Sequence, residues 1–381
     1  MLLKMPQNVR FIIDTLNENG FSAYMVGGCV RDLLLHNDPH DYDVCTSATP
    51  EDVIRLFDKT VNTGVKHGTV TVIIDKQPVE VTTFRTEGEY GDFRHPDKVV
   101  YVRDLESDLS RRDFTVNAMC YNDKEGLIDI FGGEKDLKAK VLRAVGDPDT
   151  RFKEDALRIL RLFRFCSALG FKAEEKTLAA AKQNAYLLKN ISAERISAEL
   201  SRIARGSDPA AVLPLLDCEG LPFLRKNGDI KKIPGLPDNE KLKYFAFLNL
   251  LCEDLPGALD FLKCSNAFKK YALGLRRAFE FKCENRADIK RLLAILGEDV
   301  FDMFCYKSAI SGEDTADKAA TARDIINRNE PYKISQLALN GNDIAALGYG
   351  GKEINEILKR LLETVIEDPA QNRKETLIKM I

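Results

Sequence analysis

A chain of 381 residues is too long for one ordinary domain, and its length predicts two to four. Its hydrophobic fraction of 44% and charged fraction of 30% are typical of a globular protein, which excludes a largely disordered chain. The formal net charge of −3 argues mildly against a polyanionic ligand for the chain as a whole.

Membrane and disulfide classes are also disfavoured. No segment reaches the run of about 18 apolar residues that spans a bilayer, and the first residues lack the apolar core of a signal peptide. We therefore expect a cytoplasmic protein with no membrane partner. The nine cysteines are an odd number without a CxxC pair, which indicates reduced thiols and no zinc ribbon.

The first third of the chain alternates short β-branched runs with turns and helical patterns, which predicts a mixed sheet with helices packed on it. Thr49 directly before Pro50 is a good helix N-cap, and Asp52 is close enough to complement the helix dipole. The expected helices are 5–19, 29–35 and 50–57, and the expected strands are 23–26, 41–45, 69–74 and 79–84, with a hairpin turn at 75–78.

The rest of the chain has mostly helical patterns. Residues 86–108 are polar and rich in glycine and proline, which predicts one long loop. A Gly/Pro/Lys-rich stretch at 225–238 indicates a domain boundary. The expected helices are 151–169, ended by Gly170, then 174–185, 192–205, 241–251, 258–262, 268–281, 287–296 and 315–328, with two or three short helices in 335–381.

The strongest local pattern leads from the strand at 23–26 through Gly27-Gly28 and Arg31 to Asp41 and Asp43. Paired glycines between a strand and a helix let backbone amides approach a phosphate closely. Asp41 and Asp43 share one face of an extended segment, because side chains alternate along a strand. Such carboxylates repel each other unless they share a cation, and Mg²⁺ prefers hard oxygen ligands. A solvated edge strand explains the Asp pair alone equally well, but the glycines favour a metal site.

Two further segments carry candidate residues. Glu80 faces opposite to its apolar neighbours and could join the two aspartates as a third carboxylate, although an exposed strand residue is nearly as good an explanation. Arg111, Arg112 and Asp113 precede a predicted apolar helix and could grip a triphosphate and a ribose hydroxyl. Capping of that helix by Asp113 is the structural alternative.

A basic segment follows. Asp155, Arg158 and Arg161 step by three residues and would share one side of a helix. Residues 151–205 hold twelve basic and six acidic side chains, which suits binding of phosphate or RNA. Solvated arginines with ordinary ion pairs explain the same pattern when the other motifs are ignored.

Together these motifs resemble those of class II tRNA nucleotidyltransferases, the bacterial CCA-adding enzymes, and of the related bacterial poly(A) polymerases. The resemblance covers the chain strongly up to Gly170 and more weakly at 341–362. The motifs that carry it are Gly27-Gly28-x-x-Arg31-Asp32 with Asp41-x-Asp43, then Arg111-Arg112-Asp113-Phe114-Thr115-x-Asn117-Ala118, then Glu154-Asp155-x-x-Arg158.

The resemblance implies an α+β fold with a polymerase-beta-like nucleotidyltransferase head at 1–147, followed by an all-helical neck (148–220), body (221–320) and tRNA-binding tail (321–381). It implies Mg²⁺ at Asp41 and Asp43, and Glu80 completes the expected catalytic set. The expected nucleotide-binding residues, from the motifs and the resemblance together, are Gly27, Gly28, Arg31, Arg111, Arg112, Asp113, Asp155, Arg158, Arg161 and Arg164.

The implied activity is template-independent addition of CCA to the 3′ end of tRNA from CTP and ATP. Cytosine and adenine both present an exocyclic N–H beside a ring-nitrogen acceptor, which suits Asp155 as acceptor and Arg158 as donor. Uracil and guanine present the opposite order and would leave buried polar groups unpaired.

Other activities stay open at this point. The 86–108 segment resembles the flexible loop of full CCA-adding enzymes, which favours CCA over CC addition, and the long basic C-terminal extension usual in bacterial poly(A) polymerases is missing. The alternatives are partial CC or A addition, poly(A) synthesis, nucleotide transfer onto a small molecule, and a catalytically dead RNA-binding homologue. The oligomeric state is also open.

Overall fold

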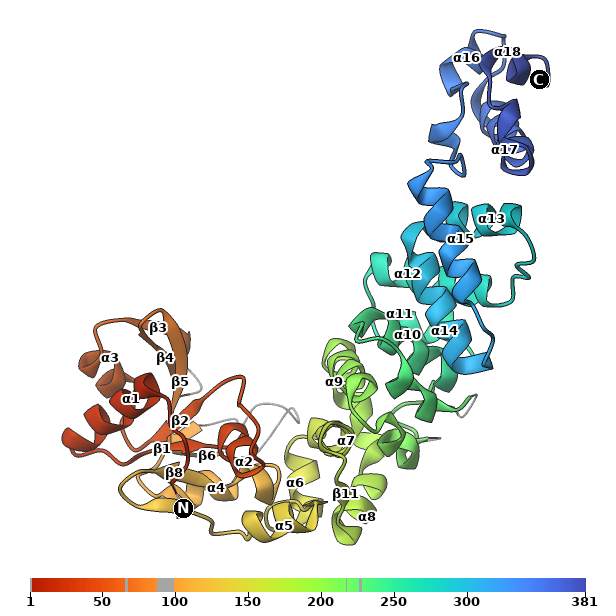
Figure 1. The fold of residues 1–381 in the computed structure, drawn as a ribbon. Coiled ribbons are helices and arrows are strands. Elements are labelled where there is room, and N and C mark those ends of the chain that lie inside the picture. Colours follow the sequence, from red (N-terminus) through yellow and green to blue (C-terminus); the bar gives the residue numbers. More distant parts are fainter. Residues whose placement is uncertain (1, 66–67, 88–98, 217, 226–227) are drawn as a thin grey trace. The chain divides into compact units, whose positions relative to one another are not determined.

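The computed structural model describes residues 2–65, 68–87, 99–216, 218–225 and 228–381. The chain forms two compact units, Met1–Arg225 and Lys226–Ile381 (Figure 1). The division between them falls at the start of the Gly/Pro/Lys-rich stretch 225–238, where the sequence indicates a boundary. The finer division at residues 147, 220 and 320 stays a prediction.

A seven-stranded mixed sheet forms the core of the first unit, as predicted. Its strand order is β3-β4-β5-β2-β1-β8-β9, with β2 and β5 parallel and all other neighbours antiparallel. The predicted hairpin turn is confirmed, because Asp75 and Lys76 both adopt positive φ between β4 and β5. The strands are β1 (Ala23–Val26), β2 (Asp43–Thr46), β3 (Thr60–Gly64), β4 (Thr69–Ile74), β5 (Gln77–Thr83), β8 (Cys120–Asn122) and β9 (Gly126–Ile128).

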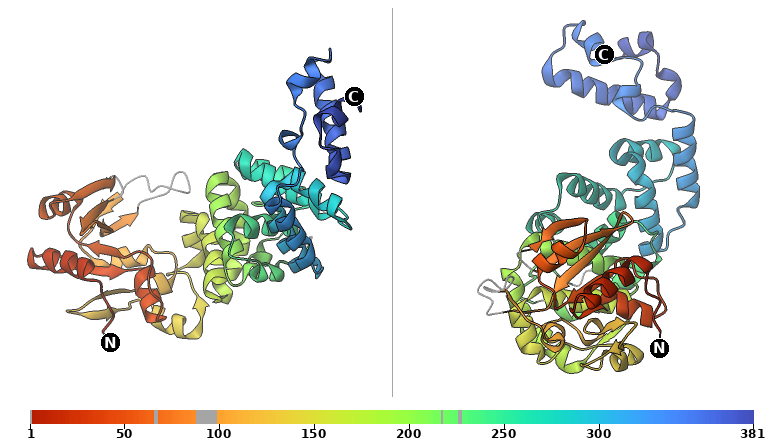
Figure 2. Two further views of the ribbon diagram at one scale, coloured as in Figure 1. Left: turned by 45° about the horizontal axis from the view of Figure 1, so that its top comes forward. Right: turned by 90° about the vertical axis from the view of Figure 1, so that its left-hand side faces the viewer.

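Three helices near the N-terminus accompany this sheet: α1 (Gln7–Glu18), α2 (Gly28–Leu34) and α3 (Pro50–Leu56). The views of Figure 2 show α1, in dark red, alongside the strands, and its buried side chains recur at helical spacing. The predicted cap of α3 is confirmed as a capping box, in which Thr49 accepts from the Asp52 amide and Asp52 accepts from the Thr49 amide.

The expected long loop at 86–108 is wrong at both ends. β6 (Arg85–Glu87) pairs with β7 (Val99–Tyr101), and α4 (Leu105–Ser110) begins soon afterwards. The Asp104 carboxylate caps α4 by accepting from the Ser107 amide at 2.8 Å. Residues 88–98, the centre of the expected loop, lie outside the described residues.

The apolar helix expected after Asp113 is also wrong. A short 3-10 turn, η2 (Thr115–Asn117), leads directly into β8, which pairs with β1 on one side and β9 on the other. The hydrogen bonds that β1 needs on its open edge outweigh the weak local preference of this apolar run. β2 likewise begins at Asp43, two residues later than expected, so that Asp41 precedes the strand.

The remainder of the first unit contains α5 (Gly133–Ala139), α6 (Pro148–Glu154), α7 (Leu157–Leu169), α8 (Glu175–Gln183), η3 (Ala185–Asn190), α9 (Ala193–Arg205) and η4 (Pro209–Leu215). The helix expected over 151–169 is wrong, because extended backbone at Asp155 separates α6 from α7. Gly170 ends α7 with φ 66°, as predicted. The all-helical expectation fails at β11 (Lys172–Ala173), which pairs with β10 (Val141–Leu142).

The second unit is helical in its described residues. The sequence reading missed α14, because its apolar residues follow no helical stripe, and α17 is longer than the short helices expected there. The helices are η5 (Ile230–Gly235), α10 (Glu240–Leu251), α11 (Leu255–Phe261), α12 (Asn266–Phe279), α13 (Arg286–Leu296), η6 (Gly297–Asp299), α14 (Val300–Ser311), α15 (Ala316–Asn327), η7 (Ile334–Gln336), α16 (Gly341–Ala345), α17 (Gly351–Glu367), η8 (Pro369–Gln371) and α18 (Lys374–Ile378).

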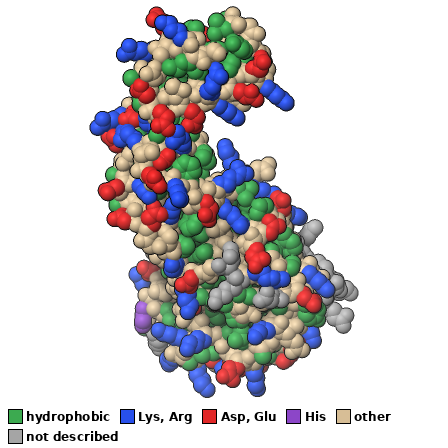
Figure 3. Space-filling view, turned by 90° about the vertical axis from the view of Figure 1, so that its right-hand side faces the viewer, with side chains coloured by type: hydrophobic (Ala, Val, Ile, Leu, Met, Phe, Trp, Pro, Cys, Tyr) green, Lys and Arg blue, Asp and Glu red, His purple; other side chains and the backbone are tan. Residues whose placement is uncertain are grey.

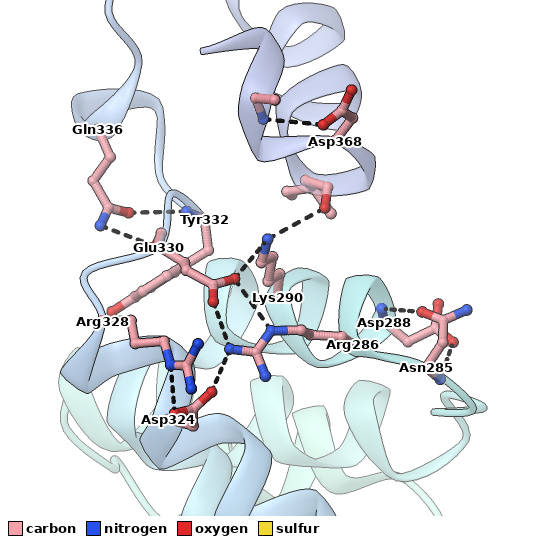
Figure 4. A network of polar contacts seen from close by, with 12 residues as sticks. Asn285, Arg286, Asp288, Lys290, Asp324, Arg328, Glu330, Tyr332, Gln336 and Asp368 are labelled. Atoms are coloured by element: carbon pink, nitrogen blue, oxygen red, sulfur yellow. Dashed lines mark hydrogen bonds and ion pairs between the residues drawn. The ribbon is translucent and has the colours of Figure 1, made fainter.

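An ion-pair network joins three parts of this second unit (Figure 4). Arg286 of α13 contacts Asp324 of α15 at 2.6 Å and Glu330 at 2.5 Å. The Lys290 side chain is buried, lies 3.0 Å from Glu330, and donates to the carbonyl of Ile366 near the end of α17. The network therefore links α13 to both α15 and α17.

The surface is mixed in charge. On the face drawn in Figure 3, Lys and Arg side chains are interspersed with Asp and Glu, in keeping with the net charge of −3. Within the described ranges, no helix has the length and apolar character needed to cross a membrane.

Candidate active site

The predicted motifs come together around one cavity of about 560 Å³ in the first unit. Eight of its sixteen lining residues are arginines and three are aspartates, so the cavity is strongly cationic. Eleven residues predicted from the sequence line it: Gly27, Gly28, Arg31, Asp43, Arg111, Arg112, Asp113, Asp155, Arg158, Arg161 and Arg164. The others are Arg85, Asn117, Leu157, Phe165 and Arg195, while Asp41 and Glu80 are not among the lining residues.

The glycine pair makes the tight connection from β1 to α2. Gly27 has φ 81° and ψ −130°, a conformation that favours glycine, and a Cβ there would lie 3.1 Å from Nη1 of Arg112. The Gly27 amide donates to the Met119 carbonyl at 3.1 Å. α2 begins at Gly28, so its first backbone amides lie beside the cavity.

Arg31, the basic residue of α2, is buried and held on two sides. Its Nε donates to Asp32 at 2.8 Å, and its Nη1 donates to the Asn117 side chain at 2.7 Å. A guanidinium held in this way is oriented before any ligand arrives, because the side-chain freedom is already restricted.

Two of the three predicted carboxylates lie side by side in the sheet. Asp43 and Glu80 are paired in the register of β2 and β5, so both side chains point to the same face. Desolvation raises the pKa of Asp43, the neighbouring Glu80 and Asp41 carboxylates raise it further, and Arg112 opposes them. No group of three or more His, Cys, Asp or Glu in the described part of the chain is spaced to hold a metal ion. The three carboxylates therefore interact through their charges without forming such a group.

Asp108, a buried aspartate that was not predicted from the sequence, holds Arg111 and Arg112. Asp108 of α4 accepts from Arg111 at 2.7 Å and from Arg112 at 3.2 Å. Burial alone would raise the pKa of Asp108, but Arg112 and Arg111 outweigh it and lower the pKa. The Arg85 amide donates to the same carboxylate at 3.3 Å. Asp108 therefore fixes the two arginines and the start of β6 around one charge.

Asp113 forms the best-satisfied ion pair of the cavity. One carboxylate oxygen accepts from the Phe114 amide and the Asn117 side chain, and the other accepts from Nε of Arg161 at 2.9 Å. Burial opposes ionisation, but Arg161 and the hydrogen bonds lower the pKa of Asp113 to about 2. The alternative prediction that Asp113 caps a helix is wrong, because the turn that follows has no side-chain cap.

Asp155 and Arg158 do not lie on one continuous helix, as the sequence predicts, because the backbone at Asp155 is extended. Asp155 precedes α7, where it accepts from the Leu157 amide at 3.0 Å and from Arg195 at 3.3 Å. The buried Arg158 guanidinium donates to Glu154 at 2.6 Å and to the carbonyl of Arg111 at 2.9 Å. Arg158 is therefore not a solvated surface arginine, and its partners hold it against the cavity.

Phe165 and Arg195 line the cavity, but no sequence motif distinguishes either residue. Phe165 follows Arg164 in an apolar helix and is typical of an ordinary core residue, whereas Arg195 is one of many basic residues in its segment. Glu199, a buried carboxylate of α9, lies 3.0 Å from Arg164 and 2.8 Å from Arg202. Desolvation and the neighbouring Arg161 charge lower the pKa of Arg164 to about 10.

Comparisons with known proteins agree with this arrangement. Residues 23–143 match the family model described as "Poly A polymerase head domain", and residues 170–222 match "Probable RNA and SrmB- binding site of polymerase A". The chain is 38% identical to a CCA-adding enzyme of Enterococcus faecalis, over 96% of this chain and 93% of the relative. It is 37% identical to one from a Geobacillus species, over 98% and 96%.

A solved structure is similar as well. The CCA-adding enzyme of Bacillus stearothermophilus in complex with CTP is 30% identical to this chain, with a TM-score of 0.83. The similarity covers 99% of this chain and 98% of that one. It therefore extends over the head, the cavity and the helical remainder.

Proposed function

The chain belongs to the family of CCA-adding enzymes, and from this premise we propose that it adds C, C and A to the 3′ end of tRNA. CTP and ATP are the nucleotide substrates, tRNA is the acceptor, and pyrophosphate is released. The observation that carries the proposal is the convergence of three separate motifs on one arginine-lined cavity, with Asp43 and the pair Asp155 and Arg158 in its lining. A cytoplasmic location suits these substrates.

Family membership implies a divalent metal ion, and we propose Mg²⁺ held by Asp41 and Asp43, with Glu80 as a third carboxylate nearby. The residues fit a hard cation, because desolvation and the neighbouring Glu80 and Asp41 carboxylates raise the pKa of Asp43, and a bound cation would offset this repulsion. When bound, the metal would activate the RNA 3′-hydroxyl for attack on the α-phosphate and neutralise the leaving pyrophosphate.

The arginines supply the positive charge for the triphosphate. Arg31, Arg112, Arg161 and Arg164 line the cavity on α2, α7 and the segment before η2. Each is already oriented by a carboxylate, so little side-chain entropy is lost when phosphate oxygens bind. Gly27 and Gly28 let the backbone approach the phosphates, while Arg111 and Asp113 act mainly by holding neighbouring groups.

We assign base selection to Asp155 and Arg158. A carboxylate oxygen of Asp155 would accept from the exocyclic amine of cytosine or adenine, and Arg158 would donate to the adjacent ring nitrogen. Both side chains are held by neighbours from different elements, Arg195 of α9 and the carbonyl of Arg111. A rigid pair of this kind rejects uracil and guanine, whose donor and acceptor are reversed.

The test uses purified protein with tRNA shortened by zero to three 3′ nucleotides, with CTP and ATP supplied separately and together. Addition that stops at CCA supports the proposal. Addition of only CC or only A would indicate a partial activity, and long A tracts on unrelated RNA would indicate a poly(A) polymerase. Labelling of a small molecule without any RNA product would overturn the assignment.

The metal assignment needs its own variants. Asp41→Ala and Asp43→Ala should each abolish incorporation while RNA binding stays largely intact, and Asp38→Ala, an exposed carboxylate of the same segment, should remain active. Full activity of both Asp41→Ala and Asp43→Ala would defeat the assignment. Chelation by EDTA should stop incorporation, and added Mg²⁺ should restore it.

A further inference from the structure

One aromatic ring, that of Phe165, lines the cationic cavity. The guanidinium carbons of three arginines lie close to the ring centroid of Phe165, with Arg31 at 5.2 Å, Arg161 at 5.5 Å and Arg164 at 4.2 Å. Arg31 comes from α2, whereas Arg161 and Arg164 come from α7, as does Phe165. The ring is therefore a common contact for side chains from two separate elements.

The protein core fixes the position of this ring. Phe165 packs edge-to-face on Phe114, with ring centroids 5.8 Å apart and an interplanar angle of 82°. Phe114 is fully buried in the segment after Asp113. Phe165 itself is only half-buried and lines the cavity. The ring would thus keep its place when the arginines move onto a ligand.

Each of the three arginines also has an acidic partner, and these partners lie on different elements. Asp32 contacts Arg31 at 2.7 Å, Asp113 contacts Arg161 at 2.5 Å, and Glu199 contacts Arg164 at 3.0 Å. A carboxylate restrains part of a guanidinium, and the aromatic ring supplies a second point of attachment. Two attachments determine the direction of a long side chain far better than one.

The chemistry of the ring suits this role. Three like charges repel one another at these distances, and the neighbouring Arg161 charge contributes to the lowered pKa of Arg164. The face of an aromatic ring attracts cations without carrying a charge of its own. A carboxylate at this position would attract the arginines more strongly but would repel phosphate oxygens. An aliphatic side chain would fill the space without attracting them.

We propose that Phe165 is a positioning residue that holds Arg31, Arg161 and Arg164 together for the triphosphate of either nucleotide. This inference rests on the proposed function of these arginines in nucleotide binding. Because the ring acts on the phosphate side, its loss should weaken CTP and ATP equally. Recognition of the base and of the RNA should not change.

The test compares Phe165→Leu, which keeps an apolar side chain, with Phe165→Tyr, which keeps the ring. We expect Phe165→Leu to raise KM for both CTP and ATP by about tenfold, with a smaller fall in kcat and an unchanged KM for tRNA. Phe165→Tyr should stay within about twofold of the parent protein. Phe11→Leu, an exposed phenylalanine on α1, is the control and should change nothing.

A direct measurement of tripolyphosphate binding tests the role of Phe165 independently of the proposed activity on tRNA. Calorimetry with inorganic tripolyphosphate, without nucleotide, RNA or added metal, should show the same loss of affinity in Phe165→Leu and its recovery in Phe165→Tyr. Inactivity of the parent protein on tRNA would end the proposed function, yet the tripolyphosphate result would still decide the role of the ring. Unchanged binding by Phe165→Leu, an equal loss in Phe165→Tyr, or a fall in kcat alone would overturn the inference.

Discussion

Replacement of Asp113 by asparagine tests how strongly one ion pair stabilises the cavity. Asp113 accepts from the Phe114 amide at 2.8 Å, from Asn117 at 3.1 Å, and from both Nε and Nη2 of Arg161. Asparagine has nearly the same shape but no charge. Its amide group would also turn a donor toward either Arg161 or the Phe114 amide. The variant therefore removes the charge and one of the two acceptor oxygens with little change in shape.

The lowered pKa sets the expected magnitude. The pKa of Asp113 is about 2 in the folded protein, against about 3.9 in an unfolded chain, so ionisation contributes about 2.5 kcal/mol to folding at neutral pH. Arg161 retains some contact with solvent, which limits the additional cost of leaving it without a counterion. We expect Asp113→Asn to lower the free energy of unfolding by about 2 to 3 kcal/mol at pH 7.

The pH dependence has a definite sign. Because folding depresses the pKa of Asp113, its contribution is present above the unfolded-chain value near 3.9 and is lost as the pH falls toward 2. The parent protein should therefore lose more stability than Asp113→Asn between pH 5 and pH 2, and the two should converge. Other acidic groups titrate in both proteins and cancel in the difference.

Urea unfolding followed by far-UV circular dichroism at several pH values measures this difference. Hydrogen exchange of peptides from α7, which carries Arg161, shows whether the loss is local to the site. A difference below about 0.5 kcal/mol at pH 7 would refute the reasoning, because substitutions without a specific role commonly fall in that range. A difference that does not change with pH would refute the assignment of the loss to the charge.

Three further substitutions probe other contacts. Glu154→Gln weakens the 2.6 Å contact to Arg158 and should raise incorporation of UTP relative to CTP by about tenfold; an unchanged ratio in competition assays would contradict this. Gly27→Ala places a Cβ 3.1 Å from Arg112 at φ 81°, so KM for both nucleotides should rise while the circular dichroism spectrum stays the same; unaltered kinetics would show that the turn is not strained. Lys290→Met removes a buried ammonium 3.0 Å from Glu330 and should lower the free energy of unfolding by about 1 to 3 kcal/mol, as measured by thermal unfolding. The control Lys282→Met, at an exposed position, should change this free energy little.

The elements that the sequence predicted well are those with a strong local pattern. β1 and β4 have the predicted bounds, because a short apolar run in β1 and a β-branched run in β4 are each bordered by turn residues. The start of α3 follows from Thr49, which accepts from a backbone amide three residues away, and from Pro50, whose fixed φ suits the first helical position. Gly170 ends α7 for a similarly local reason, its left-handed conformation.

The elements that it missed depend on distant contacts. β8 forms because β1 offers an open edge, and nothing within residues 118–122 carries that information. The break between α6 and α7 depends in part on such a contact. Asp155 accepts from the nearby Leu157 amide and also from Arg195, which lies 40 residues further along. Long-range pairing outweighs a helical propensity of a few tenths of a kcal/mol per residue.

In the candidate site, too, residues within local motifs were predicted from the sequence and residues that act through distant contacts were not. The groups expected to contact the nucleotide or the metal ion could be identified, because motifs such as Gly27-Gly28 and Asp41-x-Asp43 place them at short, fixed spacings. The side chains that hold those groups were not, since Asp108, Phe165 and Glu199 have no distinguishing neighbours in the sequence. Their function follows only from packing: each lies beside an arginine whose charge must be directed before a phosphate arrives. Variants of these supporting residues should therefore alter KM for the nucleotide while leaving the chemistry of the reaction unchanged.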